Sequence, residues 1–292
     1  MTMDRQEVHL TRKIEVSSAH SYTLDALSPA EREATFGKSA ATHAHGHNYD
    51  IRVTVAGPID ENGDWVINIK EIGRIMREKI EEQLDHRHIN IEVPKLCRRW
   101  PTLETLATFV WEEMAGSLEH VRLEEVQLFE NPDFFAEYRG EGSMIYLTRV
   151  YRFSAAHRLH NPALSDEENR AVFGKCNNPH GHGHDYVLEV TLKGHPDPKT
   201  DCLIDIGLFD SLIQKEILQR FDHVHLNLDT EEFRNLNPSS ENMVMTFWKI
   251  LDRVFPESSL HRLRLWETSR SYFDYFGPGA DSHPSSPARR NR

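Results

Sequence analysis

Alternating inward and outward side chains predict a β-strand that starts at His182. One face carries His182, His184, Tyr186, Leu188, Val190 and Leu192, and the other face is mostly polar. Because alternate residues of a strand share a face, both imidazoles point the same way at the start of the strand. A second alternating run consists of Tyr151, Phe153, Ala155 and His157. Pairing the two runs as antiparallel neighbours would bring three imidazoles together.

Three clustered imidazoles predict a metal site. A His-x-His pair alone is weak evidence, because the chain has 18 histidines. Three neutral histidines, however, leave one position of a tetrahedral zinc ion open, which is the arrangement of catalytic zinc. His157, His182 and His184 are therefore the predicted zinc ligands.

The same pattern occurs twice, at a constant offset of 137 residues and without a gap. The offset carries the three histidines onto His20, His45 and His47. It also relates Asp222 and His223 to Asp85 and His86, Glu241 to Glu104, Glu267 to Glu130, and Trp248 to Trp111. We interpret the chain as a tandem duplication, in which the retained positions are rich in chemically active side chains.

Each repeat reads as a ββααββ unit. In the first repeat, strands are predicted at 14–20, 45–55, 121–130 and 134–139, and helices at 69–84 and 103–114. In the second repeat, strands are predicted at 144–157, 182–193, 260–267 and 272–276, and helices at 206–221 and 239–255. The segment 21–42 is expected to be a polar excursion. The predicted domains are 1–140 and 141–277, and the tail 278–292, rich in Pro, Ser and Arg, is predicted to be disordered.

The composition of the chain argues against some classes of function. A formal net charge of -12 argues against a general binder of nucleic acid or of anionic membranes. Met1 to Leu10 lacks the apolar core of a signal peptide, and no run reaches membrane-spanning length, so a cytoplasmic location is expected. Three cysteines in unlike contexts are too few for a disulfide framework and are expected to be reduced.

The second repeat resembles the 6-pyruvoyl-tetrahydropterin synthase family. The resemblance rests on Phe-Ser-Ala-Ala-His at 153–157, Leu-Ser-Asp-Glu-Glu-Asn at 164–169, the stretch from Cys176 to Tyr186, Asp222-His223, and Trp-Glu-Thr at 266–268. The related 6-carboxytetrahydropterin synthases share the histidines and the Asp-His pair. They usually have a shorter spacing between Cys and His than the one from Cys176 to His182, so the resemblance favours the pyruvoyl enzyme.

The resemblance implies an α+β tunnelling fold, in which ββααββ units assemble antiparallel sheets around a barrel with the helices outside. It implies Zn²⁺ held by the second histidine triad, and active sites at unit interfaces. The substrate would be 7,8-dihydroneopterin triphosphate, converted by a lyase reaction to 6-pyruvoyl-tetrahydropterin and triphosphate. No external redox cofactor is needed, in keeping with the lack of a glycine-rich dinucleotide motif.

By the same resemblance, Cys176 would be the general base and Asp222 with His223 the couple that activates it. Glu267 would accept hydrogen bonds from the donor-rich edge of the pterin, and Glu241 and Lys175 would belong to the substrate-binding set. Each residue alone also has an ordinary structural interpretation. Cys176 would then be a small buried hydrophobe, the Asp-His pair a helix cap, and Glu267 an exposed strand residue.

The first repeat departs from this pattern, because Ser39 stands where the second repeat has Cys176. It retains His20, His45, His47, Asp85, His86 and Glu130. One hypothesis is that this repeat binds zinc and a pterin with poor turnover, since a serine hydroxyl is a weak acid. A rival hypothesis lets His43 replace the base and gives the site a different reaction, such as side-chain cleavage.

Three further expectations concern partners and alternatives. A homo-oligomer is expected, with three chains or more building the body that single-repeat relatives build from more subunits. The alternative activity is 6-carboxy-5,6,7,8-tetrahydropterin synthase, recognised by acetaldehyde release. The second alternative is a pterin- or metal-binding protein without catalysis.

Overall fold

The computed structural model describes residues 7–41, 43–59, 65–118, 120–255 and 259–279. Residues 280–292 of the predicted tail lie outside the described residues. The chain divides into two compact units: unit 1 comprises Met1–Arg149 with Leu192–Ser211, and unit 2 comprises Val150–Thr191 with Leu212–Arg292. Leu192–Ser211 belongs to the second repeat by sequence and to unit 1 by its packing. Among the described residues, no helix has both the length and the apolar character that a bilayer crossing requires.

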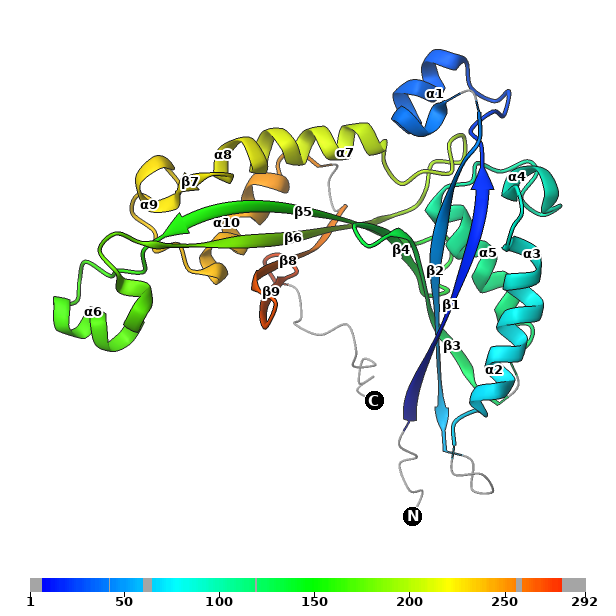
Figure 1. The fold of residues 1–292 in the computed structure, drawn as a ribbon, viewed down its shortest axis with the longest axis horizontal. Coiled ribbons are helices and arrows are strands. Elements are labelled where there is room, and N and C mark those ends of the chain that lie inside the picture. Colours follow the sequence, from blue (N-terminus) through cyan, green and yellow to red (C-terminus); the bar gives the residue numbers. More distant parts are fainter. Residues whose placement is uncertain (1–6, 42, 60–64, 119, 256–258, 280–292) are drawn as a thin grey trace. The chain divides into compact units, whose positions relative to one another are not determined.

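Unit 1 is an antiparallel sheet with helices on one face (Figure 1). Its strands are β1 (Glu7–His20), β2 (His45–Pro58), β3 (Arg122–Asn131) and β4 (Phe134–Tyr138), followed by the first residues of β5 (Ile145–His157). Its helices are α1 (Pro29–Phe36), α2 (Ile69–Met76), α3 (Glu82–Leu84), α4 (Ile89–Glu92) and α5 (Leu103–Ala115). A π-helical segment, Arg77–Glu81, joins α2 to α3, so this stretch is one continuous helix.

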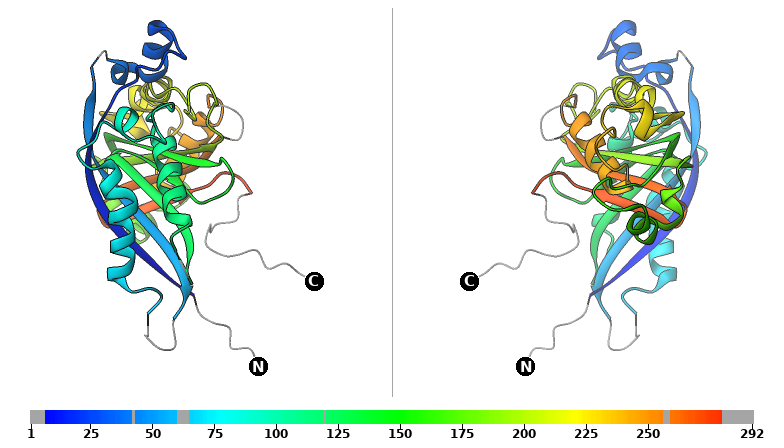
Figure 2. Two further views of the ribbon diagram at one scale, coloured as in Figure 1. Left: turned by 90° about the vertical axis from the view of Figure 1, so that its right-hand side faces the viewer. Right: turned by 90° about the vertical axis from the view of Figure 1, so that its left-hand side faces the viewer.

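The core of unit 1 lies between the sheet and these helices. On β2, Ile51, Val53 and Val55 are fully buried, while most of the alternate positions remain partly exposed. Helix α2 presents Ile72 and Met76 to the same core, and α2 and α3 run along β1 (Figure 2). The period of two on the strand and of about four on the helix thus fix which face each element buries.

Unit 2 has a similar arrangement of strands and helices. Its strands follow the order β5, β6 (His182–Gly194), β8 (Leu260–Thr268) and β9 (Ser271–Tyr275), and β7 (Val224–His225) lies parallel to β5. Its helices are α6 (Asp166–Phe173), α8 (Gln219–Phe221), α9 (Leu226–Asp229) and α10 (Ser240–Leu251), and α7 (Ile206–Ile213) starts within unit 1. Helix α10 packs on β8 and β9. The predicted α+β class with antiparallel strands is confirmed.

Two eight-residue helices were not predicted: α1, in the segment expected to be a polar excursion, and α6, at the matching place in the second repeat. Ser28 caps α1 and Ser165 caps α6, each in a reciprocal capping box with the glutamate three residues later. Two backbone N–H groups are satisfied by such a box, which stabilises a short polar helix without an apolar stripe. The Ser-x-x-Glu spacing, present in both repeats, was the available signal.

A glycine packed on a tryptophan ends each repeat. Gly140 has φ +74°, and a Cβ at this position would lie 2.3 Å from Cζ2 of Trp111. At the matching position Gly277 has φ +92°, and its Cβ would lie 2.5 Å from Cζ2 of Trp248. Only glycine satisfies both the left-handed backbone and the close approach.

Gly140→Ala is therefore expected to destabilise unit 1 by about 2–4 kcal/mol, as the sum of backbone strain and overpacking. Gly142→Ala is the matched control, since Gly142 has φ +64° but a Cβ added there would meet nothing within 4 Å. The control should lose only about 1 kcal/mol of stability, because the substitution there strains the backbone alone. Thermal unfolding measures both, and equal losses would show that contact with Trp111 is unimportant.

Candidate functional site

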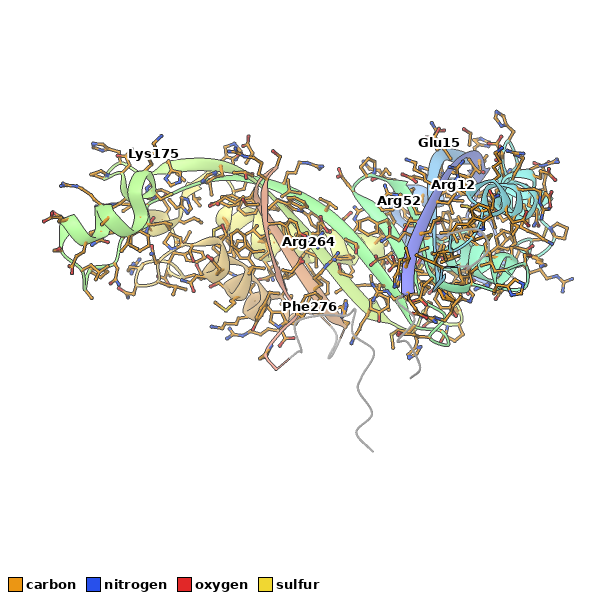
Figure 3. The ribbon with its side chains drawn as sticks, turned by 90° about the horizontal axis from the view of Figure 1, so that it is seen from below. Arg12, Glu15, Arg52, Lys175, Arg264 and Phe276 are labelled. Carbon is orange, nitrogen blue, oxygen red and sulfur yellow. The ribbon has the colours of Figure 1, made fainter. Side chains whose placement is uncertain are left out.

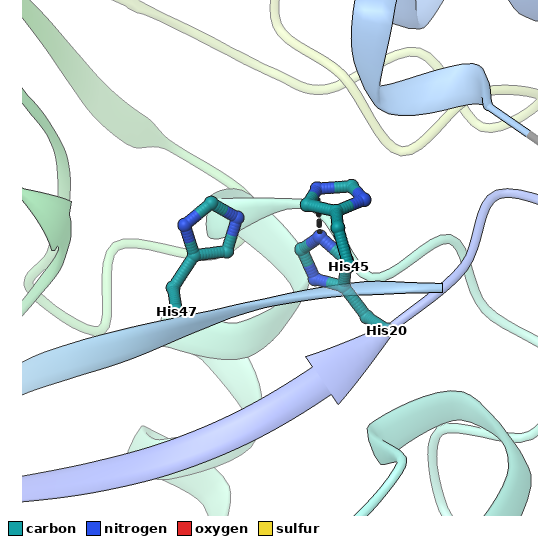
Figure 4. A group of neighbouring side chains, drawn as sticks. All are labelled: His20, His45 and His47. Atoms are coloured by element: carbon teal, nitrogen blue, oxygen red, sulfur yellow. Dashed lines mark hydrogen bonds between the residues drawn. The ribbon is translucent and has the colours of Figure 1, made fainter. Parts of the chain in front are cut away.

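The first histidine triad is assembled by the register of β1 and β2. His20, the last residue of β1, lies opposite His45, the first residue of β2, and His47 follows on the same face. The Nε2 atoms of His20 and His45 are 2.8 Å apart (Figure 4). One ligand atom from each of the three residues lies within 4.8 Å of the others. This is the spacing of nitrogen ligands around a single ion.

The second triad has the same construction. His157 ends β5, and His182 and His184 begin β6. The Nε2 atoms of His157 and His182 are 3.2 Å apart, and the three ligand atoms again lie within 4.8 Å of one another. The structure thus brings together all six histidines that the sequence predicted, as two separate triads.

Burial favours the neutral form of five of the six imidazoles, and this is the form that binds metals. His20 and His157 are each only 1% exposed. Burial, with a smaller contribution from the neighbouring imidazoles, lowers the pKa of His20 to about 3. Burial also lowers the pKa values of His45, His47, His157 and His182. Neutral imidazole has a free lone pair for a metal ion near neutral pH.

Unpartnered nitrogen atoms show that the triads suit an ion. Among the described residues, the buried atoms without a hydrogen-bond partner include Nε2 of His47 and Nε2 of His184. Buried polar atoms are rarely left unpaired without a reason. A cation between the three rings would satisfy both atoms, so the residues present fit a bound metal.

Hydrogen bonds to the far side of the rings fix their orientation. Nδ1 of His157 donates to the carbonyl oxygen of Pro238 at 2.8 Å. In the first repeat, the hydroxyl of Tyr49 lies 2.8 Å from Nδ1 of His20. Both bonds leave Nε2 directed into the triad, which is the role of outer-sphere groups in metal sites. These two partners were not predicted from the sequence, although Tyr49 and Tyr186 share the repeat offset.

A carboxylate lies beside each triad. Oε1 of Glu267 is 3.6 Å from Nε2 of His184 and 3.9 Å from Nε2 of His157. Oε1 of Glu130 is 3.9 Å from Nε2 of His47. Burial raises the pKa of Glu130 to about 7, and the positive charge of Arg149 opposes this rise. Each carboxylate can therefore contact both a bound ion and a ligand beside it.

Cys176 lies in the 3-10 turn Gly174–Asn177, between α6 and the start of β6. Its thiol is free and half-buried, and its backbone oxygen accepts the Leu159 N–H at 2.9 Å. The buried Asn177 side chain holds the same turn, since Nδ2 donates to the Leu159 oxygen at 2.7 Å. Lys175 is exposed. The matching turn of the first repeat has Ser39 and Ala40, and so lacks both the thiol and the amide.

The Asp-His pairs form dyads at a strained turn. His223 has φ +58°, and its Nδ1 is 2.8 Å from Oδ1 of Asp222, which also accepts the Ser154 N–H. His86 and Asp85 repeat this geometry at 2.7 Å, with φ +55° at His86. The His223 side chain is 80% exposed. Among the described residues, the dyad is bonded to Ser154 and neither to Cys176 nor to the triad.

Unit 1 contains a pocket that includes Glu130, the carboxylate next to its triad. The cavity, about 430 Å³, is lined by residues that include Lys38, Ser39, Glu104, Glu130, Arg149 and Asp210. Glu104 is 3% exposed, and its Oε1 accepts the Leu203 N–H at 2.9 Å. Burial raises the pKa of Glu104 to about 6. Its counterpart Glu241 is exposed. The two repeats thus differ in the burial of this glutamate.

Comparison with known proteins identifies the repeat. A model of the 6-pyruvoyl tetrahydropterin synthase family matches the chain twice, over residues 9–141 and 146–278. The 6-pyruvoyl tetrahydrobiopterin synthase of Poecilia reticulata is 40% identical over 132 residues, which cover 45% of this chain and 90% of that relative. The Homo sapiens protein of the same name is 36% identical over 138 residues. The match covers 47% of this chain and 95% of the Homo sapiens protein. The two family matches confirm the resemblance and the tandem duplication.

Related proteins with another name match more weakly. The 6-carboxy-5,6,7,8-tetrahydropterin synthase of Rickettsia typhi is 28% identical over 152 residues, covering 45% of this chain and 99% of that relative. Among solved structures, 6-pyruvoyl tetrahydropterin synthase of Caenorhabditis elegans is 38% identical to this chain, with a TM-score of 0.45. The match covers 46% of this chain and 96% of the Caenorhabditis elegans chain. Each relative therefore matches about half of this chain with almost its full length.

Metal content provides the first test of the triads. Because both triads are complete, the zinc-loaded chain is expected to bind two ions. His20→Ala and His157→Ala should each remove one ion, and the double variant should remove both. His180→Ala, at an exposed histidine outside the triads, should keep two. Elemental analysis after dialysis measures these numbers, and a single ion that only His157→Ala removes would show that the first triad is not a metal site.

The buried carboxyl of Glu104 predicts a pH dependence of stability. Its folded pKa of about 6 exceeds the ordinary value of 4.5, so the carboxyl becomes destabilising as the pH rises through this window. Glu104→Gln keeps an acceptor for Leu203 and should stabilise the chain by about 2 kcal/mol at pH 8, with little effect at pH 4. Glu112→Gln, at an exposed position of the same helix, should leave the stability unchanged at both pH values. Thermal unfolding between pH 4 and pH 8 measures these stabilities. A Glu104→Gln variant that is less stable than the wild-type chain at pH 8 would contradict an energetic cost of burying the ionised carboxylate.

Proposed function

The chain belongs to the 6-pyruvoyl tetrahydropterin synthase family, and on that premise we propose that its second repeat is a zinc-dependent lyase. The proposed reaction converts 7,8-dihydroneopterin triphosphate to 6-pyruvoyl-tetrahydropterin and triphosphate. The observation that carries the proposal is the combination, in this repeat, of a complete triad, the half-buried thiol of Cys176 and the carboxylate of Glu267. Names of relatives at 36–40% identity support the same reaction.

His157, His182 and His184 would hold the zinc ion. When bound, zinc supplies Lewis acidity toward the hydroxyl and carbonyl oxygens of the substrate side chain. Burial of His157 favours its neutral form, and the bond to Pro238 directs the ligand nitrogen into the site. The protein residues around the site then have two remaining tasks: they hold the pterin and move protons.

Glu267 is proposed to hold the pterin through its amino-pyrimidinone edge, whose N–H groups donate to a carboxylate. Its distance of 3.6 Å from His184 supports a binding mode in which the pterin ring lies beside the metal. Glu241 and Lys175, both exposed, are proposed to extend the substrate site, with Lys175 near the triphosphate.

Cys176 is proposed to be the general base that removes a proton from a side-chain carbon. A thiol with an ordinary pKa near 8.5 is mostly protonated at neutral pH, so it needs a proton acceptor or a cation nearby. The dyad of Asp222 and His223 is the proposed acceptor. Since the dyad is bonded to Ser154 and exposed, we assign it to a Cys176 site in a neighbouring copy.

The first repeat is proposed to bind metal and a pterin without turnover. It keeps the triad and Glu130 but has Ser39 in place of the thiol. Ala40 also replaces Asn177, so the turn loses the amide that fixes it in the second repeat. The rival hypothesis, in which His43 acts as the base of a different reaction, predicts turnover of a pterin by the first repeat alone.

Assembly is proposed as well. The strand order of the described chain ends in β1 and in β9, and each of these two strands has one neighbour in that order. Unpaired edges invite pairing with another chain. We therefore propose a homo-oligomer of three chains or more whose sheets together form a barrel.

Product analysis tests the proposed reaction. With 7,8-dihydroneopterin triphosphate, the zinc-loaded chain should release triphosphate and the pyruvoyl pterin. Cys176→Ala should lower the rate by about 100-fold or more, the usual contribution of a general base. Ser39→Ala is the matched control and should keep the wild-type rate.

Mass spectrometry of the products separates the alternatives. A carboxy pterin with acetaldehyde would replace the proposed activity by 6-carboxy-5,6,7,8-tetrahydropterin synthase. Retained turnover in Cys176→Ala would refute the role of the thiol. Pterin binding without turnover in the wild-type chain would favour the binding protein without catalysis.

A further inference from the structure

The two repeats use the backbone carbonyl at one matching position differently. Pro101 and Pro238 are related by the repeat offset, and each directly precedes the N-cap residue of a long helix, α5 or α10. Both prolines are buried. In the second repeat the Pro238 oxygen accepts Nδ1–H of His157 at 2.8 Å. In the first repeat the Pro101 oxygen instead accepts the hydroxyl of Tyr22 at 3.2 Å.

The partner of the buried triad histidine changes with the use of this carbonyl. Nδ1 of His20 lies 2.8 Å from the hydroxyl of Tyr49. Tyr186, the counterpart of Tyr49, is fully buried, and its hydroxyl has no hydrogen-bond partner in the part of the chain that the structure describes. The ring centroids of tyrosine and histidine are 6.3 Å apart both for Tyr49 with His20 and for Tyr186 with His157. The tyrosine is thus equally near in both repeats, and the imidazole is bonded to it only where the carbonyl is already occupied.

One difference between the repeats accounts for this exchange of partners. The counterpart of Tyr22 is Leu159, whose side chain has no hydroxyl to donate to the carbonyl. The backbone of Leu159 supports the turn that carries Lys175 (Figure 3) and Cys176, since its N–H donates to the Cys176 oxygen at 2.9 Å. The side chain of Tyr22 is buried, and its hydroxyl is held at the proline carbonyl. The carbonyl is therefore available to the histidine in the second repeat alone.

The partner of Nδ1 determines whether Nε2 is free to bind a metal. A carbonyl oxygen only accepts, so it keeps the proton of neutral His157 on Nδ1 and leaves a lone pair on Nε2. A phenol can also donate. When the Tyr49 hydroxyl donates to Nδ1, the proton of neutral His20 lies on Nε2, which is 2.8 Å from Nε2 of His45. Metal binding at this triad then requires that the proton move to Nδ1 and that the hydroxyl of Tyr49 rotate.

We infer that Tyr22 is a positioning residue that weakens metal binding at the first triad. By occupying the carbonyl of Pro101, it leaves His20 with a partner that stabilises the tautomer unable to bind a metal. Both triads still fill at saturating zinc, because the tautomer of His20 can change. The inference rests on the metal sites of the proposed function and not on its reaction.

Tyr22→Phe tests this role, because it removes the hydroxyl and keeps the ring. The Pro101 oxygen would then be buried without a donor, which is costly, so Nδ1–H of His20 is expected to bind it. Zinc affinity at the first triad should rise about 10-fold or more, the usual effect of an outer-sphere partner. Competition with a chelator measures the affinity in a His157→Ala background, where only the first triad is complete. A substitution that merely damaged the site would lower the affinity.

Two further tyrosines provide matched controls. Tyr138 is also a buried tyrosine of unit 1, and its hydroxyl also donates to a backbone carbonyl, that of Gly142. Tyr138→Phe should therefore leave the zinc affinity of the first triad unchanged. Tyr186→Phe, measured in a His20→Ala background, should leave the affinity of the second triad unchanged, because its hydroxyl has no partner among the described residues.

A crystal structure of the metal-free Tyr22→Phe chain gives a second readout. Nδ1 of His20 should lie within hydrogen-bonding distance of the Pro101 oxygen. Unchanged or weaker zinc binding by this variant, or a His20 still bonded to Tyr49, would overturn the role of Tyr22. A wild-type chain that binds zinc at neither triad would overturn the metal sites and this role together. A zinc-loaded chain without lyase activity would refute the proposed reaction and leave this role intact.

Discussion

The register between two antiparallel strands is the constraint on which both candidate sites depend. His20 lies opposite His45 at the end of β1, and His47 follows on the same face of β2. A slip of one residue would turn the imidazoles to the opposite face of the sheet. Burial of Ile51 and Val53 along the same strand opposes such a slip, because their alternation sets which face meets the helices. The apolar core of the unit thus fixes the geometry of the metal ligands.

Once this frame is duplicated, the chemistry of each copy is set by short segments outside the strands. The 3-10 turns differ at Ser39 and Cys176, and at Ala40 and Asn177. Such positions can change without disturbing the register or the core. One copy can therefore keep the metal frame without the thiol, while the other retains both. A tandem chain can diverge in this way more easily than a single repeat can, because its two copies are parts of one chain but make different contacts.

Much of this arrangement could be predicted from the sequence. The alternation of side chains along a strand and the constant repeat offset can both be read directly from residue positions. The triads were predictable, since three histidines recur at one offset on strands of clear period. Helices α1 and α6 were missed because Ser28 and Ser165 stabilise them through caps rather than through an apolar stripe. The bond from His157 to Pro238, and the cover of Glu104 by Leu203, join residues 81 and 99 positions apart and depend on tertiary packing alone. No local pattern encodes such contacts.

One strand register, used twice, should build two metal sites of the same form. Anomalous diffraction at the zinc edge, from crystals of the zinc-loaded chain, is the decisive measurement. We expect two peaks per chain, each about 2.0–2.1 Å from three imidazole nitrogens, at His20, His45 and His47 and at His157, His182 and His184. A peak at the second triad alone would refute the equivalence of the two frames. Zinc bound elsewhere, with both triads empty, would refute the metal sites altogether.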